Sequence, residues 1–151
     1  MSNCLILYAS QTGNVESISK FICQEIKDSF LLCNIYPMNH FSNKIEELND
    51  YKKIFFLCST TGNGEIPDNA INFWKNIKNR KHSKNLLENV HYFLIAFGDT
   101  NYSMFCFAGK KLNKRLLELD AKPILPMICV DAVDDEEEQV DKIFAVIKSI
   151  I

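Results

Sequence analysis

The stretch LYASQTGNVES, residues 7–17, joins an apolar run to a segment of helical periodicity through a short polar turn that contains Gly13. Residues 5–8 are typical of a buried strand, and apolar residues recur after the turn at helical spacing: Ile18, Ile22, Cys23 and Ile26. A tight turn that enters a helix presents backbone N–H groups without intrahelical partners and the positive end of the helix dipole. The stretch therefore predicts a strand, a helix and, between them, a turn suited to an anion.

The same alternation continues along the chain. Short apolar runs of strand length occupy Leu5–Tyr8, Leu32–Tyr36, Ile54–Cys58, Tyr92–Phe97 and Ile124–Val130. Segments of helical spacing occupy Val15–Lys27, Ala70–Asn79, Ser103–Leu119 and Glu137–Ile150, with a weaker one at Ile45–Leu48. The second helix is expected to bury Ile71, Trp74 and Ile77, and the third to bury Leu112, Leu116 and Leu119. This alternation favours an α/β fold, in which helices cover both faces of a parallel sheet of five strands.

Length and composition limit the functional classes. The chain has 151 residues, 47% of them hydrophobic, which is enough for a single domain, residues 1–151, with a substantial core. Seventeen basic and nineteen acidic side chains give a net charge of −2, which argues against nucleic acid and anionic membranes as partners. No apolar run is long enough to span a bilayer, and residues 1–8 lack the pattern of a signal peptide. We therefore expect a soluble, cytoplasmic protein whose partner is a small molecule or another protein.

The six cysteines do not form a pattern typical of disulfides or metal sites. No CxxC pair occurs, and most of the cysteines lie in apolar or helical segments: Cys4, Cys23, Cys58 and Cys129. Buried reduced thiols are the better interpretation. The three histidines are not spaced from a cysteine as zinc ligands are, so we expect no metal site.

Function is expected at the carboxyl ends of the strands, because ligands of open parallel sheets bind in the crevice there. Three loops that follow strands are rich in hydroxyl groups, amides and glycine: Ser10–Asn14, Ser59–Gly64 and Gly98–Tyr102. The first loop contains no Lys or Arg and matches neither the P-loop nor the GxGxxG pattern, which argues against nucleoside triphosphates and dinucleotides. It suits a monophosphate held by hydrogen bonds, although an ordinary N-capped turn has the same signature.

The other two loops favour a planar ligand. Gly62 and Gly64 leave room for a flat ring close to the backbone, and Tyr102 offers an aromatic face for stacking. A phosphate cradle, a glycine-lined slot and a stacking tyrosine together fit flavin mononucleotide (FMN).

Over nearly its whole length the chain resembles the flavodoxin-type FMN domain of the diflavin reductases. SQTGNVES at 10–17 is similar to the family's phosphate loop, CSTTGNGEIPDNAINFWKNI at 58–77 to its second flavin loop with the following helix, and FGDTNYSMFCFAGKKLNKRLLEL at 97–119 to its third loop. The resemblance implies a flavodoxin-like three-layer α/β/α sandwich with a five-stranded parallel sheet of order 2-1-3-4-5. It is strongest to the NADPH-dependent diflavin oxidoreductases, which reduce anamorsin in cytosolic iron–sulfur cluster assembly. Methionine synthase reductase is the next most similar, and cytochrome P450 reductase is more distant.

The resemblance also implies which residues bind the cofactor. The 5′-phosphate would bind to the first loop, at Ser10, Gln11, Thr12, Gly13 and Asn14. One side of the isoalloxazine ring would be lined by Thr60, Thr61, Gly62, Asn63 and Gly64, and the other by Gly98, Asp99, Asn101 and Tyr102. Phe105 and Cys106 would lie beside the ribityl chain, and Asp131 near the flavin.

Two positions depart from the family's pattern. Thr61 stands where several diflavin reductases have a second aromatic residue, and stacking on one side only should weaken FMN binding. Ala132 follows Asp131 where relatives often have another acid, so Asp131 is a single carboxylate here.

The cofactor defines the expected activity. FMN accepts electrons in pairs and can release them singly, so we expect no catalytic acid, base or nucleophile from the protein; the carbonyl of Gly62 would face N5 of the ring. Electrons would come from NADPH through a separate FAD-containing reductase module, in cis or in trans, and pass to an acceptor redox protein of the anamorsin type. The alternatives are an FMN domain of the methionine synthase reductase or P450 reductase type, a free-standing flavodoxin, and a flavin-free protein-interaction module.

Two charged clusters have ordinary structural explanations. Asp134–Glu138 would meet the positive end of the last helix's dipole, although the run could also dock a basic partner. Lys110, Lys111, Lys114 and Arg115 are expected on the solvated face of the third helix, with a contact patch as the alternative.

Overall fold

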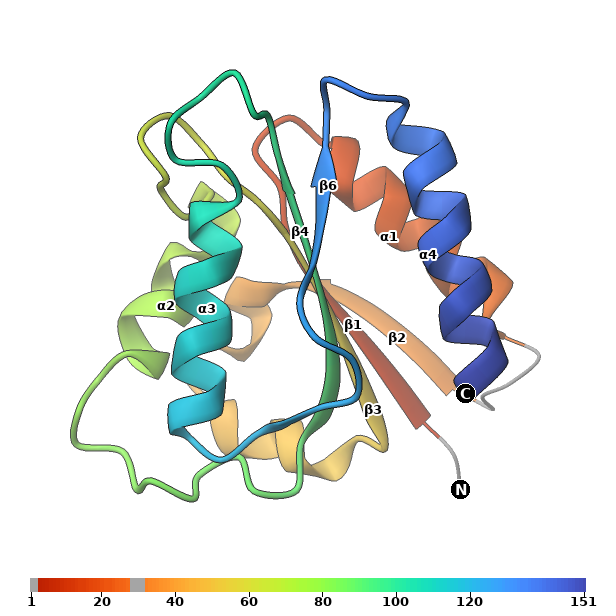
Figure 1. The fold of residues 1–151 in the computed structure, drawn as a ribbon. Helices are drawn as coiled ribbons and strands as arrows, with labels where there is room; N and C mark the ends of the chain where they lie inside the picture. The colour runs from red at the N-terminus through yellow and green to blue at the C-terminus, as the bar shows by residue number, and fades with distance from the viewer. Residues whose placement is uncertain (1–2, 28–31) are drawn as a thin grey trace.

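The apolar runs form a parallel sheet in the computed structural model, which describes residues 3–27 and 32–151. The strands are β1 (Asn3–Ala9), β2 (Leu32–Pro37), β3 (Lys53–Ser59), β4 (His91–Gly98), β5 (Lys122–Pro123) and β6 (Ile128–Asp131). Their order is β2-β1-β3-β4-β5, with β6 also paired to β4, which confirms the expected order 2-1-3-4-5. The carboxyl ends of β1, β3 and β4 therefore lie side by side (Figure 1). Residues 1–2 and 28–31 of the expected domain lie outside the described residues.

The last strand differs from its prediction. The sequence predicts one strand over Ile124–Val130, but β5 ends at Pro123 and β6 begins at Ile128. Both segments pair with β4, so the fifth position of the sheet is filled by two short strands. Pro126 explains the break, because proline has no N–H group to donate to a strand ladder.

Helices cover both faces of the sheet (Figure 1). One face carries α1 (Asn14–Glu25) and α4 (Glu136–Ile150), and the other carries α2 (Ile71–Ile77) and α3 (Phe107–Glu118). Short 3-10 helices occupy Met38–Phe41, Ile45–Asp50 and Asp68–Ala70. α3 begins at Phe107 and not at Ser103, because its N-cap residue Cys106 has a left-handed backbone conformation with φ 53°. Residues 103–106 therefore remain in a loop at the carboxyl ends of the strands.

Alternate side chains of each strand build two separate cores, as the period of two requires. In β1, for example, Leu5 and Leu7 pack toward α2 and α3, whereas Cys4 and Ile6 pack toward α1 and α4. At Gly109, α3 approaches β4 so closely that an added Cβ would lie 2.5 Å from the Cβ of Ala96. Such burial of apolar side chains contributes about 1.5–3 kcal/mol for each large residue.

The buried faces of α2 and α3 agree with the sequence only in part. In α3 the expected leucines are buried: Leu112, Leu116 and Leu119. In α2 the buried residues are Phe73 and Ile77, whereas Ile71 and Trp74 are half-buried. The predicted helix and the burial of Ile77 are confirmed, but the buried face contains Phe73 in place of Ile71 and Trp74.

Arg115 is buried, which corrects its expected place on a solvated face. Its side chain is 8% exposed, and its guanidinium donates from Nε to the carbonyl of Ile77 (2.7 Å) and from Nη2 to that of Asn79 (2.9 Å). Its Nη1 donates to Oε1 of Glu118 (3.1 Å). Because carbonyls at the end of a helix lack intrahelical donors, Arg115 supplies from α3 a donor to Ile77, the last residue of α2, and a second donor to Asn79 in the turn that follows.

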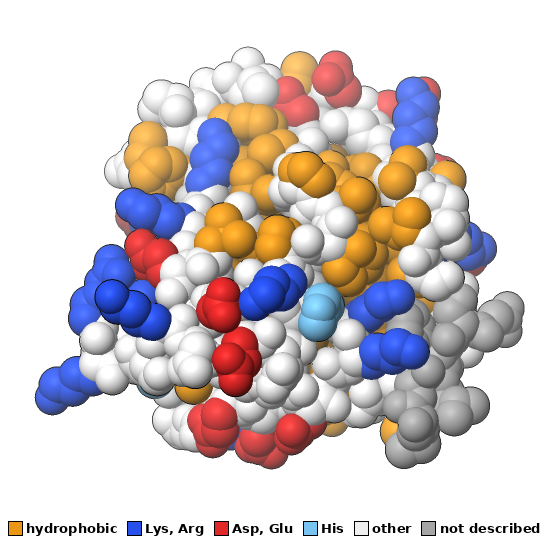
Figure 2. Space-filling view, turned by 60° about the horizontal axis from the view of Figure 1, so that its bottom comes forward, with side chains coloured by type: hydrophobic (Ala, Val, Ile, Leu, Met, Phe, Trp, Pro, Cys, Tyr) orange, Lys and Arg blue, Asp and Glu red, His pale blue; other side chains and the backbone are white. Residues whose placement is uncertain are grey.

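Figure 2 shows the surface around the amino-terminal ends of the strands. Lys and Arg side chains are interspersed there with Asp and Glu side chains, so neither sign of charge covers this face continuously. In the described part of the chain, no helix has the length and apolar character needed to cross a membrane.

Candidate functional site

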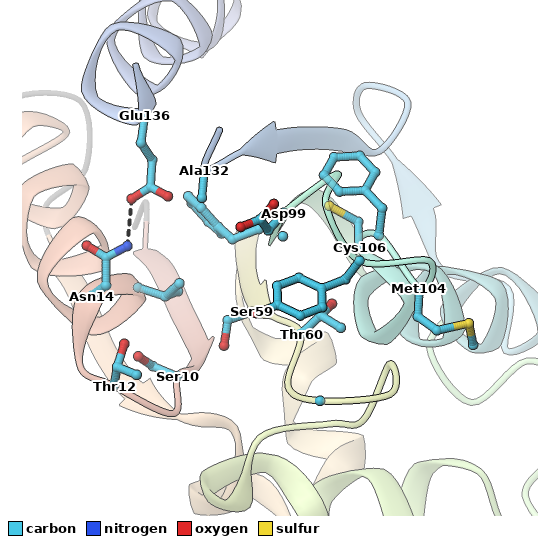
Figure 3. A pocket seen from close by; sticks show the side chains of 16 residues that line it. Ser10, Thr12, Asn14, Ser59, Thr60, Asp99, Met104, Cys106, Ala132 and Glu136 are labelled. Carbon is cyan, nitrogen blue, oxygen red and sulfur yellow. Dashed lines mark hydrogen bonds between the residues drawn. The ribbon is translucent and has the colours of Figure 1, made fainter. Parts of the chain in front are cut away.

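A hollow of about 350 Å³ lies at the carboxyl ends of β1, β3 and β4 (Figure 3). Three walls come from the loops that follow these strands, and the start of α4 supplies a fourth. The residues that line it are Ser10, Thr12, Asn14, Val15, Ser59, Thr60, Gly62, Phe97, Gly98, Asp99, Tyr102, Met104, Phe105, Cys106, Ala132 and Glu136. Hydroxyl and amide groups gather at the start of α1, and aromatic side chains belong to the wall that follows β4.

The first wall is the loop after β1, which leads into α1, and no side chain caps the start of this helix. The N-cap residue Gly13 has φ 89°, a conformation that glycine adopts without strain, and its N–H donates to Oγ of Ser10 (3.1 Å). Among the described residues, the N–H groups of Asn14, Val15 and Glu16 have no acceptor. By contrast, α4 is capped by the Asp135 side chain. The start of α1 therefore leaves free donors and a positive dipole end beside the hollow.

The second wall is a closed turn. The N–H and hydroxyl of Thr61 both donate to the carbonyl of Glu65, at 3.0 and 3.2 Å, and the N–H of Glu65 donates back to the carbonyl of Thr61 at 2.9 Å. Thr60 Oγ1 accepts from the N–H of Ala108 (3.3 Å), which ties this loop to the first turn of α3. Thr60 and Gly62 line the hollow, whereas the hydroxyl of Thr61 is used inside the turn.

The third wall runs from the end of β4 to the start of α3. The carboxylate of Asp99 accepts from the N–H of Asn101 (2.8 Å), and the Asp99 carbonyl accepts from the N–H of Tyr102 (3.0 Å). This turn leaves the Tyr102 side chain 64% exposed at the edge of the hollow. Burial, and then the neighbouring Cys129, raises the pKa of Cys106 to about 12, so Cys106 presents a neutral thiol to the hollow.

Asp131 holds the loop after β4 in place by hydrogen bonds. Its carboxylate accepts from the hydroxyl of Thr100 (2.7 Å), the N–H of Thr100 (3.1 Å) and the N–H of Val133 (3.1 Å). These hydrogen bonds, that of the Thr100 hydroxyl above all, hold the pKa of Asp131 below its ordinary value. Asp131 does not line the hollow; it fastens the loop that does.

The start of α4 brings a carboxylate to the first loop. Glu136 lines the hollow, and its Oε1 accepts a hydrogen bond from Nδ2 of Asn14 at 2.6 Å (Figure 3). In the part of the chain that the structure describes, no group of three or more His, Cys, Asp and Glu side chains is arranged to hold a metal ion.

The structure brings many of the expected site residues to one hollow: Ser10, Thr12, Asn14, Thr60, Gly62, Gly98, Asp99, Tyr102, Phe105 and Cys106. Others lie beside it and do not line it: Gln11, Gly13, Thr61, Asn63, Gly64, Asn101 and Asp131. Gln11, for instance, exchanges hydrogen bonds with Asp68. The contacts of all these residues with FMN remain predictions.

The sequence assigns no flavin contact to several residues that line the hollow: Val15, Ser59, Phe97, Met104, Ala132 and Glu136. Ser59 begins the second of the three loops, and Phe97 could have been found by extending the third loop one residue into β4. Glu136 belongs to an acidic run, and nothing in that run indicates that α4 starts beside the first loop.

Comparison with known proteins agrees with this geometry. A family model described as Flavodoxin matches residues 6–143. The chain is 38% identical over 124 residues to NADPH-dependent diflavin oxidoreductase 1 of Xenopus laevis, covering 82% of this chain and 20% of that protein. It is 35% identical over 126 residues to the NADPH sulfite reductase flavoprotein alpha-component of Shewanella sp. (strain ANA-3), covering 83% and 20%.

A solved structure shows the same fold over the full length. Oxidised Flavodoxin 1 from Bacillus cereus superposes with a TM-score of 0.77 at 20% identity, over 99% of each chain. The chain spans about a fifth of the length of the curated relatives it matches. Because the family model covers most of the chain and the hollow lies at the expected strand ends, the chain belongs to the flavodoxin family.

Proposed function

We propose that residues 1–151 form an FMN-binding domain that transfers electrons as part of, or together with, an NADPH-dependent diflavin reductase. Membership of the flavodoxin family supports FMN as the cofactor. The observation that carries the proposal is the uncapped start of α1, which leaves three backbone N–H groups without acceptors in the described residues, beside a hollow at the strand ends.

The residues present fit both ends of FMN. The hydroxyls of Ser10 and Thr12, the Asn14 amide and the free N–H groups of α1 would hold the 5′-phosphate. Tyr102 would face the isoalloxazine ring, Thr60 and Gly62 would border it, and Phe105 would lie beside the ribityl chain. The hollow thus pairs a polar end that suits an anion with an aromatic end that suits a flat ring.

When bound, FMN supplies the electron-carrying chemistry, so the chain's own residues need only bind, orient and shield it. Gly62 has φ 41° and is exposed, and its carbonyl accepts no hydrogen bond from the described residues. The carbonyl of Gly62 is therefore available to the ring. The neutral thiol of Cys106 adds no charge to the hollow.

The proposal extends to the electron source and the acceptor. Similarity to proteins named NADPH-dependent diflavin oxidoreductase 1 supports a source in NADPH, through an FAD-containing reductase module in cis or in trans. From the resemblance of the three loops to this group we also propose a cytoplasmic acceptor of the anamorsin type in iron–sulfur cluster assembly. The test pairs the reduced domain with its reductase module and offers it several acceptors. Reduction of other acceptors but not of an anamorsin protein would contradict the proposed acceptor and leave the proposed FMN domain standing.

The decisive experiment is a titration of the flavin-stripped protein with FMN, followed by flavin absorbance and fluorescence. Riboflavin, which lacks the phosphate, is the matched control. We expect saturable FMN binding and much weaker riboflavin binding. A folded sample that binds neither flavin would exclude the electron carrier and favour a flavin-free interaction module.

A further inference from the structure

Glu136 places a negative charge where the proposed site holds an anion. Its carboxylate and the Asn14 amide both line the hollow, with Ser10 and Thr12 on the same side (Figure 3). The distance from Asn14 Nδ2 to Glu136 Oε1 is 2.6 Å. Asn14 is also one of the donors expected to bind the phosphate, so the carboxylate and the phosphate would share one amide group.

The start of α4 does not need Glu136 for its own stability. Asp135 already caps the helix by accepting from the N–H of Glu138, and Glu137 and Glu138 provide two further acids in the first turn. In the described part of the chain, Glu136 forms no ion pair with a Lys, Arg or His that would neutralise it. Among the described residues, no side-chain cation therefore cancels the charge that Glu136 brings to the hollow.

A carboxylate that lines the same hollow as a bound phosphate would change the affinity of the site selectively. Two negative charges a few ångströms apart repel each other even at a solvent-exposed surface, and the repulsion grows with the charge of the ligand. A flavin with a phosphate experiences this repulsion, whereas a flavin without one does not. The effect should also weaken as salt screens it, because the Debye length falls to about 3 Å at 1 M ionic strength.

We propose that Glu136 is a specificity-determining residue of the flavin site: its charge weakens the binding of phosphate-bearing flavin and so sets how strongly FMN is preferred over riboflavin. The inference rests on the proposed function. It concerns one residue of α4 whose charge acts on the phosphate end of the site, next to Asn14.

The test compares Glu136→Gln with Glu137→Gln, which removes the same charge from the next residue of the same helix. Glu137 does not line the hollow, so it serves as the matched control. FMN and riboflavin are titrated into each flavin-stripped protein at low ionic strength. We expect Glu136→Gln to lower the Kd for FMN by about five- to tenfold, with riboflavin unchanged, and Glu137→Gln to change the Kd for FMN by less than about twofold. At about 1 M salt the two variants should converge.

The choice of glutamine separates charge from geometry. The new side chain keeps an acceptor oxygen for the Asn14 amide, so a mere orienting role of Glu136 would leave FMN binding unchanged. Nitrogen-15 NMR of the Asn14 side-chain amide gives a second readout: its resonance should move when FMN is added but not when riboflavin is added.

The outcomes separate the role of Glu136 from the existence of the phosphate site. Weaker FMN binding by Glu136→Gln, or the same small change as in Glu137→Gln, overturns the role of Glu136 and leaves the FMN site standing. A wild-type protein that does not prefer FMN over riboflavin overturns the proposed phosphate site, and the role of Glu136 falls with it.

Discussion

At the scale of single residues, the candidate site divides into side chains that line the hollow and side chains that hold its loops in shape. Tyr102 is 64% exposed and lines the hollow, whereas Asp131 lies outside it and binds the Thr100 backbone and hydroxyl. The two groups should respond differently to substitution. Loss of a lining side chain should change the affinity for the ligand. Loss of a side chain that holds a loop should change the conformation of the loop and the pKa of the groups bonded to it.

Tyr102→Ala tests the aromatic wall. We expect the Kd for FMN to rise about fivefold, because an aromatic contact of this kind contributes about 1 kcal/mol. Tyr102→Phe keeps the ring and should change the Kd by less than about twofold. Since the side chain is largely exposed, neither variant should change the free energy of unfolding by more than about 0.5 kcal/mol. Equal affinity in all three proteins, measured by flavin fluorescence, would show that Tyr102 does not contact the ring.

Thr100→Val tests the support behind that wall. The substitution removes the hydroxyl that donates to Asp131 at 2.7 Å, so the pKa of Asp131 should rise toward its ordinary value. A depressed pKa in the folded state contributes stability above the unfolded pKa of about 3.9, and this contribution is lost as the pH falls through the folded value. The acid-induced loss of stability from Asp131 should therefore be smaller in Thr100→Val.

Carbon-13 NMR of the Asp131 carboxyl, over the acid range around its ordinary pKa, measures the shift directly. Thr12→Val, at an exposed residue without a bond to Asp131, is the control. An unchanged Asp131 titration in Thr100→Val would mean that the backbone hydrogen bonds alone set this pKa.

At the scale of elements, the sequence predicts helices and strands that have a repeating apolar pattern, but it does not reveal boundaries that depend on the conformation of one residue. The strands β1, β3 and β4 are uninterrupted apolar runs, so their positions and the crevice at their ends follow from periodicity. The break between β5 and β6 follows from one proline, Pro126, whose effect could have been foreseen. The start of α3 depends on one left-handed residue, Cys106, which is not glycine and gives no signal in the sequence.

Burial of charge is the other element-scale feature that periodicity does not reveal. Arg115 follows Lys114 in a basic run, yet it is buried because the end of α2 presents carbonyls that need donors. Glu136 likewise belongs to an acidic run but reaches the first loop. The place of each side chain depends on its contacts with a neighbouring element, and the local sequence does not reveal these contacts.

Arg115→Ala tests how strongly α3 holds α2. The change leaves the carbonyls of Ile77 and Asn79 without these donors, and we expect the free energy of unfolding to fall by about 2–4 kcal/mol. Lys114→Ala, at the exposed neighbouring position, should change it by less than about 0.5 kcal/mol. Urea unfolding followed by the fluorescence of Trp74, the only tryptophan and a residue of α2, reports this directly. Similar midpoints for the two variants would contradict the role assigned to Arg115.

At the scale of the whole molecule, the site exists only because the sheet brings distant segments together. The walls begin at Ser10, Ser59 and Gly98, which are far apart in the sequence and follow three neighbouring strands. The start of α4 adds a fourth segment from the other end of the chain. An unfolded chain would hold none of these groups in place, so any ligand of the hollow must bind the folded state alone.

This dependence predicts how FMN affects stability. A ligand that binds only the folded state stabilises it by RT ln(1 + [L]/Kd), which is about 2.7 kcal/mol at a free concentration one hundred times the Kd. The midpoint of thermal unfolding should therefore keep rising with the logarithm of the FMN concentration above the Kd. Riboflavin should have a much smaller effect at the same concentration, because it cannot use the N–H groups at the start of α1. If FMN binds in a titration but leaves the midpoint unchanged, it must bind the unfolded chain equally well, and the hollow at the strand ends would not be its site.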